Sequence, residues 1–194
     1  YRDELGTIGD ALVITPVTTV MDEPTLFFYE DDKYYEPNNY KNVFYGMIPV
    51  REALQRSLNV PTVKVAERVG FDRIADLAHR LGLNADIRPY PSIALGSFEV
   101  TPIEMAGAYT AFANEGVRVE PRSLRQVADE DGHVLQTYAL ESEQVIEPEL
   151  AYLMTNLLEN VINRGTGVGV RARGFRLPAA GKTGTSRDGW FAGY

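Results

Sequence analysis

The stretch that decides the fold is residues 179–194, AAGKTGTSRDGWFAGY. It allows two interpretations that imply different chemistry. The letters GKT at 181–183 occur in loops that bind phosphate through backbone N–H groups. The letters KTGT at 182–185 are followed by a turn-like segment and then by an apolar aromatic run. That order is instead typical of two strands in a hairpin.

The residues before this stretch argue against a phosphate-binding loop. Such a loop needs a glycine, four further residues and then Gly-Lys-Thr or Gly-Lys-Ser. The position that requires the glycine is Arg176, and Pro178 removes a backbone donor. The cluster GTGVG at 165–169 also misses the spacing of the dinucleotide fingerprint and has no strand before it. We therefore expect no nucleotide and no other cofactor.

A strand over 182–185 would present an anion-binding set of side chains. Glycine allows a ligand backbone to approach closely. Since side chains alternate along a strand, Lys182 and Gly184 would face one way, and Thr183 and Thr185 the other. One ammonium and two hydroxyls suit a carboxylate. The three letters alone also fit an edge strand with a solvated lysine.

A second candidate is Ser57-Leu58-Asn59, between two predicted helices. A hydroxyl and an amide two residues apart on a loop can both point into a cleft, where serine can relay a proton and asparagine can bind a peptide amide. The alternative is a helix end at which Ser57 or Asn59 satisfies backbone groups.

The pattern along the chain predicts an α+β protein. Helices are expected where apolar residues recur at helical spacing between proline or Thr-x-x-Glu starts and glycine stops, at 49–57, 61–69, 71–81, 102–115 and 148–163. Short extended segments are expected in 11–29, a solvated Tyr-rich loop at 30–46, and hairpins at 117–129 with 133–138 and about the turn 186–189. Helices segregated from antiparallel strands suggest α+β layering.

Composition excludes several classes of function. The chain has 194 residues, a net charge of -8 and no cysteine, so nucleic-acid binding, disulfides and thiolate sites are not expected. Two histidines cannot build a His-rich metal site, and we expect His79 in a helix and His133 in a turn to be structural or surface residues. No apolar run is long enough to span a membrane. No initiator methionine or signal peptide is visible, so a fragment of a longer protein is expected.

Together the two motifs carry a resemblance. Ser57-x-Asn59 and Lys182-Thr183-Gly184 are two of the three motifs of penicillin-binding proteins and serine β-lactamases. Further agreement comes from YEPNNY at 35–40, RGTG at 164–167 and WFAG at 190–193. Nearly the whole chain resembles the transpeptidase domain of class A (bifunctional) penicillin-binding proteins.

The resemblance implies a β-lactamase/transpeptidase-like fold, an antiparallel sheet flanked by helices. It implies a peptidoglycan D-Ala-D-Ala transpeptidase that cross-links stem peptides through a serine acyl-enzyme and binds β-lactams. Ser57 would shuttle protons, Asn59 would bind the donor peptide's amide, and Lys182 would supply positive potential. Thr183 and Thr185 would bind the terminal carboxylate, and the N–H of Thr185, beside Gly184, would be half of an oxyanion hole.

One motif of the family is missing. No serine in the chain is followed three positions later by lysine. We therefore expect residues 1–194 to be a partial transpeptidase domain, incomplete at both ends, with the nucleophile before Tyr1 and the last strand and helix beyond Tyr194. Alone it would not acylate, and its uncovered edges would favour aggregation.

Three alternatives stay open. A serine β-lactamase or carboxypeptidase shares the motifs but needs a base for deacylation. A penicillin-sensing module would acylate without turnover, and a homologue without a nucleophile would be structural or regulatory. The resemblance further implies an extracytoplasmic location, periplasmic or on the outer face of the inner membrane, within a membrane-anchored parent protein.

Overall fold

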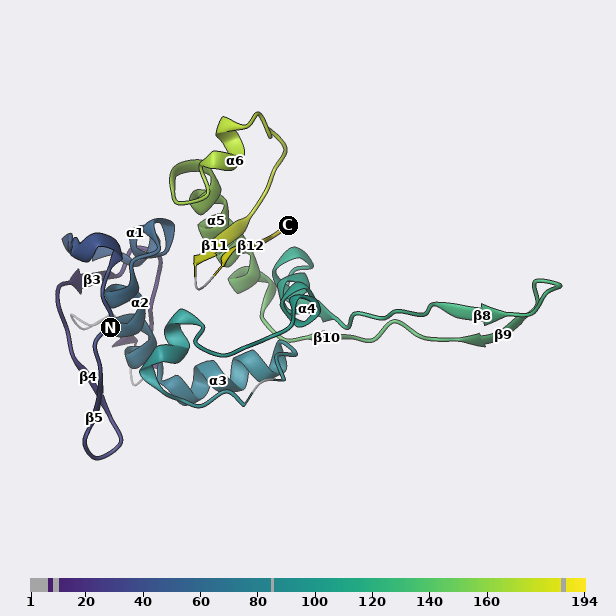
Figure 1. Ribbon diagram of the computed structural model, residues 1–194, viewed down its shortest axis with the longest axis horizontal. Coiled ribbons are helices and arrows are strands. Elements are labelled where there is room, and N and C mark those ends of the chain that lie inside the picture. Colours follow the sequence, from purple (N-terminus) through teal and green to yellow (C-terminus); the bar gives the residue numbers. More distant parts are fainter. Residues whose placement is uncertain (1–6, 9–10, 85, 186–187) are drawn as a thin grey trace.

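A computed structural model of the chain describes residues 7–8, 11–84, 86–185 and 188–194 (Figure 1). Five of the described helices lie where the sequence predicts them, and one short helix and two 3-10 turns were not predicted. The helices are α1 (Val50–Arg56), α2 (Asn59–Val69), α3 (Phe71–Arg80), α4 (Pro102–Ala113), α5 (Pro148–Arg164) and the short, unpredicted α6 (Gly169–Ala172), with 3-10 turns η1 (Tyr40–Asn42) and η2 (Pro91–Leu95). Within the described ranges, none of these helices has the length and apolarity to cross a bilayer.

The strands form antiparallel pairs, which confirms the α+β prediction. The pairs are β1 (Thr7–Ile8) with β2 (Ala11–Leu12), β3 (Thr19–Asp22) with β6 (Gly46–Pro49), β4 (Phe27–Tyr29) with β5 (Lys33–Tyr35), β7 (Val117–Val119) with β10 (Ser142–Gln144), β8 (Gln126–Ala128) with β9 (Val134–Thr137), and β11 (Gly181–Thr185) with β12 (Gly189–Gly193). The predicted terminal hairpin is therefore confirmed, although 186–187 lie outside the described residues.

The prediction of one strand over 117–129 is wrong. The segment splits into β7 and β8, which pair with different partners. Pro121 lies in the break and has no N–H to donate to a ladder, so the strand cannot continue through it. Beyond the break, β8 and β9 form an exposed arm that extends away from the rest of the molecule (Figure 1).

The helix α5 packs in the core against both α1, which ends at the first motif, and β11, which carries the second. Leu158, Val161 and Ile162 of α5 are at most 1% exposed. The helix packs against α1 and α4 and also against β11 (Figure 1). A second cluster joins β3, β6 and α1 through Val20, Ile48, Ala53 and Leu58. These contacts set the distance between the end of α1 and the start of β11.

Candidate active site

Ser57 lies at the end of α1 in a left-handed backbone conformation. Its φ and ψ are 58° and 44°, and its N–H bonds to Leu54 O at 3.1 Å. A residue other than glycine adopts this region at a cost of about 1–2 kcal/mol, so the surroundings have to hold it. Leu58 does so: its side chain is 7% exposed in the core and its N–H donates to Ala53 O at 2.9 Å. The Ser57 side chain is consequently exposed.

Asn59 begins α2, two residues earlier than the predicted start at Pro61. Its backbone N–H donates to Asn39 Oδ1 at 2.9 Å. Its side-chain Nδ2 donates to Asn38 O at 2.6 Å. An asparagine amide has a second N–H and an acceptor oxygen, so the Asn59 side chain can bind a ligand while it keeps this bond.

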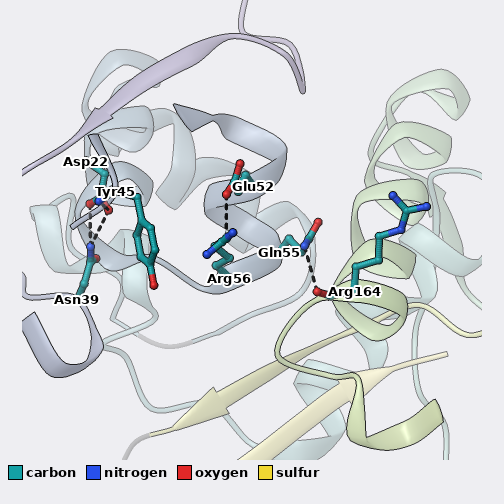
Figure 2. A network of polar contacts seen from close by, with 7 residues as sticks. All are labelled: Asp22, Asn39, Tyr45, Glu52, Gln55, Arg56 and Arg164. Carbon is teal, nitrogen blue, oxygen red and sulfur yellow. Dashed lines mark hydrogen bonds and ion pairs between the residues drawn. The ribbon is translucent and has the colours of Figure 1, made fainter. Parts of the chain in front are cut away.

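Asn39 belongs to a buried polar network behind this turn (Figure 2). Asn39 and Asp22 are 3% and 1% exposed. Asn39 Nδ2 donates to the two Asp22 carboxylate oxygens at 2.7 and 3.0 Å, and the Tyr45 N–H donates to Asp22 Oδ2 at 3.0 Å. The prediction that 30–46 is a solvated loop is therefore wrong at buried Asn39, and also where β5 pairs with β4 and where η1 forms. A side-chain amide 20 residues before the helix it contacts gives no local signal for this role.

The second motif lies on β11, and the pairing of this strand decides which way its backbone points. Ala180 and Tyr194 exchange both backbone hydrogen bonds, at 2.8 and 2.9 Å. In an antiparallel pair such residues alternate with residues whose backbone groups face away from the partner strand. Thr183 and Thr185 consequently direct their N–H and C=O groups away from β12. No described strand pairs with that edge.

Lys182 joins the two motifs. Its Nζ donates to Ser57 Oγ at 2.7 Å and to Thr183 O at 2.8 Å. Burial lowers the pKa of the Lys182 ammonium below its usual value, because the charged form loses hydration there. The bond thus brings Ser57, at the end of α1, and Lys182 of β11 together, and Asn59 lies two residues after Ser57 at the start of α2.

The three remaining predicted residues follow along β11. Thr183 is half-buried, and its Oγ1 lies 2.6 Å from Thr166 Oγ1. Gly184 and Thr185 are exposed, with Gly184 opposite Trp190 of β12. Thr166 extends the row of hydroxyls. Its signal in the sequence is the RGTG run at 164–167, which carried part of the resemblance without a residue role.

A close contact joins α1 to the end of α5 beside these hydroxyls. The Gln55 side chain donates to Arg164 O at 3.1 Å (Figure 2), and the Thr166 N–H donates to Gln55 O at 3.2 Å. Gly165 lies between them, and a Cβ there would be 2.2 Å from Gln55 O. Glycine is therefore required by the approach of the two backbones, and the contact lies two residues from Ser57.

The two histidines lie elsewhere. His79 Nδ1 is 3.1 Å from Leu83 O, at the end of α3. His133 contacts Asp129 at 3.1 Å at the tip of the arm, where the Asp129 carboxylate also accepts backbone N–H groups and closes the turn. Both are exposed, which confirms that they are surface or turn residues.

Comparison with known proteins gives a family. The family model "Penicillin binding protein transpeptidase domain" matches residues 10–194. The chain belongs to the penicillin-binding protein transpeptidase family. It is 36% identical over 180 residues to penicillin-binding protein 1B of Vibrio cholerae, covering 91% of this chain and 23% of that protein. It is 33% identical over 235 residues to penicillin-binding protein 1A of Pseudomonas aeruginosa, covering 93% and 28%.

Solved structures confirm the fold. A crystal structure of penicillin-binding protein 1A from Haemophilus influenzae matches with a TM-score of 0.83 at 23% identity, covering 93% of this chain and 33% of that one. An imipenem acyl-enzyme complex of penicillin-binding protein A from M. tuberculosis matches with a TM-score of 0.77 at 19% identity, covering 96% and 47%. The family model and the curated relatives confirm the resemblance to class A transpeptidase domains. The chain spans about a quarter of the length of the first two curated relatives.

Proposed function

We propose that this chain is the substrate-binding side of a serine-type D-Ala-D-Ala transpeptidase that cross-links peptidoglycan stem peptides. The observation that carries the proposal is the 2.7 Å bond from Lys182 Nζ to Ser57 Oγ. It brings an ammonium and a hydroxyl together beside β11, and Asn59 follows that hydroxyl by two residues. These groups can bind a peptide that ends in a carboxylate and can move a proton beside it.

The edge of β11 suits the end of a stem peptide. A terminal carboxylate would accept from the Thr183 and Thr185 hydroxyls in the field of the Lys182 ammonium. The Thr185 N–H points away from β12 and is free of that ladder, so it can donate to the oxyanion of a tetrahedral intermediate. The Asn59 side chain would bind an amide of the donor peptide, next to the same edge.

Ser57 would carry the proton. Its oxygen accepts from Lys182 Nζ, and its own O–H is then directed to another acceptor. In the first step Ser57 Oγ would give its proton to the nitrogen of the leaving D-Ala and take one from Lys182 Nζ. In the second step Ser57 Oγ would take a proton from the incoming amine and pass its own back to Lys182 Nζ. The lowered pKa of Lys182 supports this role, since it reduces the free-energy cost of moving a proton between the two groups.

The attacking serine would come from outside these residues. No serine of the chain has a lysine three positions later, and Ser57 already accepts from Lys182 on the binding edge. We propose that residues 1–194 form part of a transpeptidase domain and do not acylate alone. The complete protein would bind β-lactams and act outside the cytoplasm, anchored to the membrane through other segments.

Intact-mass measurement after incubation with benzylpenicillin tests the proposal. We expect an adduct on the natural longer polypeptide that includes a Ser-x-x-Lys segment and none on the 194-residue chain. In the longer polypeptide, Ser57→Ala should slow acylation strongly, whereas Ser97→Ala should leave it unchanged, because Ser97 bonds to Ser92 away from the site. A folded longer polypeptide without an adduct would instead indicate a non-catalytic homologue. An adduct on the 194-residue chain would show that one of its own serines is the nucleophile, and Ser57 would be the first to replace.

A further inference from the structure

The Asp22–Asn39 pair is buried, charged and outside the set of residues that would touch a substrate. Asp22 ends β3, and its carboxylate accepts from Asn39 Nδ2 and from the Tyr45 N–H. A buried carboxylate is costly unless such donors surround it. Both partners are almost inaccessible to solvent, so the pair cannot bind a ligand directly.

The carboxylate determines how the Asn39 amide is turned. Asn39 Nδ2 donates to Asp22 and to Val43 O, at 2.7 and 3.0 Å. Its Oδ1 is thereby directed to the start of α2, where it accepts from the N–H groups of Asn59 and Val60 at 2.9 and 3.2 Å. The flipped amide would set an NH₂ group against two N–H donors and a carbonyl oxygen against the carboxylate.

Asn39 therefore supplies the cap that α2 cannot supply itself. The N-cap residue of α2 is Leu58, whose apolar side chain has no acceptor for the first N–H groups. The neighbouring Asn38 O holds the Asn59 side chain at 2.6 Å. The 38–39 segment thus fixes both the backbone and the side chain of Asn59, two residues from Ser57.

We infer that Asp22 and Asn39 are positioning residues that hold the Ser57–Asn59 turn against Lys182. The inference rests on the proposed function for its catalytic consequence. Asp22 orients the Asn39 amide, the amide oxygen holds the first turn of α2, and the turn carries Ser57 to 2.7 Å from Lys182 Nζ. A shift of about 1 Å in such a contact can lower a rate on the order of a hundredfold.

The test exchanges the two side chains. Asp22→Asn puts an NH₂ group in place of one of the two carboxylate oxygens that accept from Asn39 Nδ2, and Asn39→Asp places two carboxylates together, so each single variant weakens the pair. In the double variant the amide introduced at position 22 can donate to the carboxylate introduced at position 39, whose other oxygen still accepts from the Asn59 and Val60 N–H groups. The bond to Val43 O is then lost. Benzylpenicillin acylation of the natural longer polypeptide should fall roughly tenfold to a hundredfold in each single variant and recover to within about threefold in the double variant.

A second measurement does not need activity. Competitive acetylation of the folded natural longer polypeptide as a function of pH, read by peptide mass spectrometry, reports the environment of each lysine amine. In both single variants the Lys182 profile should shift toward higher pH, because its amine becomes more hydrated, and the double variant should restore it. Lys33, on the β4–β5 hairpin, serves as the internal reference.

Thr110→Val is the matched control for stability. Thr110 Oγ1 accepts from the Val119 N–H at 2.8 Å and joins α4 to β7, away from the turn. The control should lower the melting temperature yet leave the Lys182 profile and the acylation rate unchanged.

Several outcomes would overturn the inference. Folded single variants with the wild-type Lys182 profile and acylation rate would do so, as would a folded double variant no better than the single ones. If neither single variant folds, the double variant decides: a folded protein with the wild-type profile supports the inference, and an unfolded one refutes it. The expected Lys182 profiles in a longer polypeptide that never acylates would refute the proposed function and leave the positioning intact.

Discussion

Replacing Gly165 by alanine perturbs the contact between α1 and α5 directly beside the site. A Cβ at this position would lie 2.2 Å from Gln55 O and 2.9 Å from Gln55 Cγ. The backbone of Gly165 is extended, with φ -114° and ψ -150°, a region that alanine also adopts. The cost of the substitution is therefore steric, and the nearest atom is backbone, which a rotamer change cannot move.

The size of the effect follows from these distances. The Gln55 carbonyl has to withdraw by about 1 Å to reach ordinary van der Waals separation. That movement weakens the bonds from the Thr166 N–H to Gln55 O and from Gln55 Nε2 to Arg164 O, at 3.2 and 3.1 Å. Overpacking and the weakened bonds together cost about 3 kcal/mol. For a domain of this size the melting temperature should fall by roughly 6–12 °C.

Thermal unfolding followed by circular dichroism measures this, with Gly169→Ala as the matched control. Gly169 starts α6, and no described atom lies within 4 Å of its Cβ position, so alanine there should change the melting temperature by only about 2 °C. In the natural longer polypeptide, Gly165→Ala should also slow acylation by about tenfold or more, because Gln55 lies only two residues before Ser57. If the Gly165→Ala chain has the same melting temperature as the Gly169→Ala control, the backbones of Gln55 and Gly165 are not held rigidly together and the reasoning is refuted.

Three further predictions concern single side chains. Burial lowers the pKa of Lys182 relative to the unfolded chain, so the charged ammonium lowers the free energy of unfolding at neutral pH. This loss shrinks as pH rises toward about 10.4, because the folded chain releases the proton first. Urea titrations over this pH range should show the free energy of unfolding of the wild type rising relative to that of Lys182→Met. Thr101 and Glu104 form a capping box, so Thr101→Ala should lower the free energy of unfolding by about 1 kcal/mol in the same titrations. Thr166→Val removes an exposed hydroxyl 2.6 Å from Thr183 Oγ1, so stability should change by less than about 0.5 kcal/mol while benzylpenicillin acylation weakens by a few-fold.

The helices could be predicted from the sequence because their signals are local. In α4, the Thr101 cap and the Glu104 side chain lie within one turn of each other, and both expected bonds are present. The antiparallel terminal hairpin was likewise predictable from its glycines and aromatic residues. These features depend on neighbours in the chain, and the tertiary structure only has to leave them undisturbed.

The features that sequence reasoning missed depend on residues far apart in the chain. The helix α2 starts at Asn59 and not at the predicted Pro61, because its first N–H groups are capped by Asn39. Asn39 is in turn oriented by Asp22, which lies on a separate strand. Gly165 has no unusual backbone angle, so only the approach of Gln55 explains why glycine stands there. Neither contact follows from periodicity, turn residues or charge.

The site itself combines both kinds of information. The two short motifs were predicted residue by residue, yet the contact from Lys182 to Ser57 depends on α5, which packs against both α1 and β11. The contacts form a closed ring, because Ser57 follows Gln55, Gln55 holds Thr166, Thr166 meets Thr183, and Lys182 returns to Ser57. Because the contacts form a closed ring, moving one of them strains the others. The 2.7 Å contact between Lys182 and Ser57 therefore depends on every other contact in the ring. This is why a substitution at a residue that touches no substrate is expected to slow the chemistry.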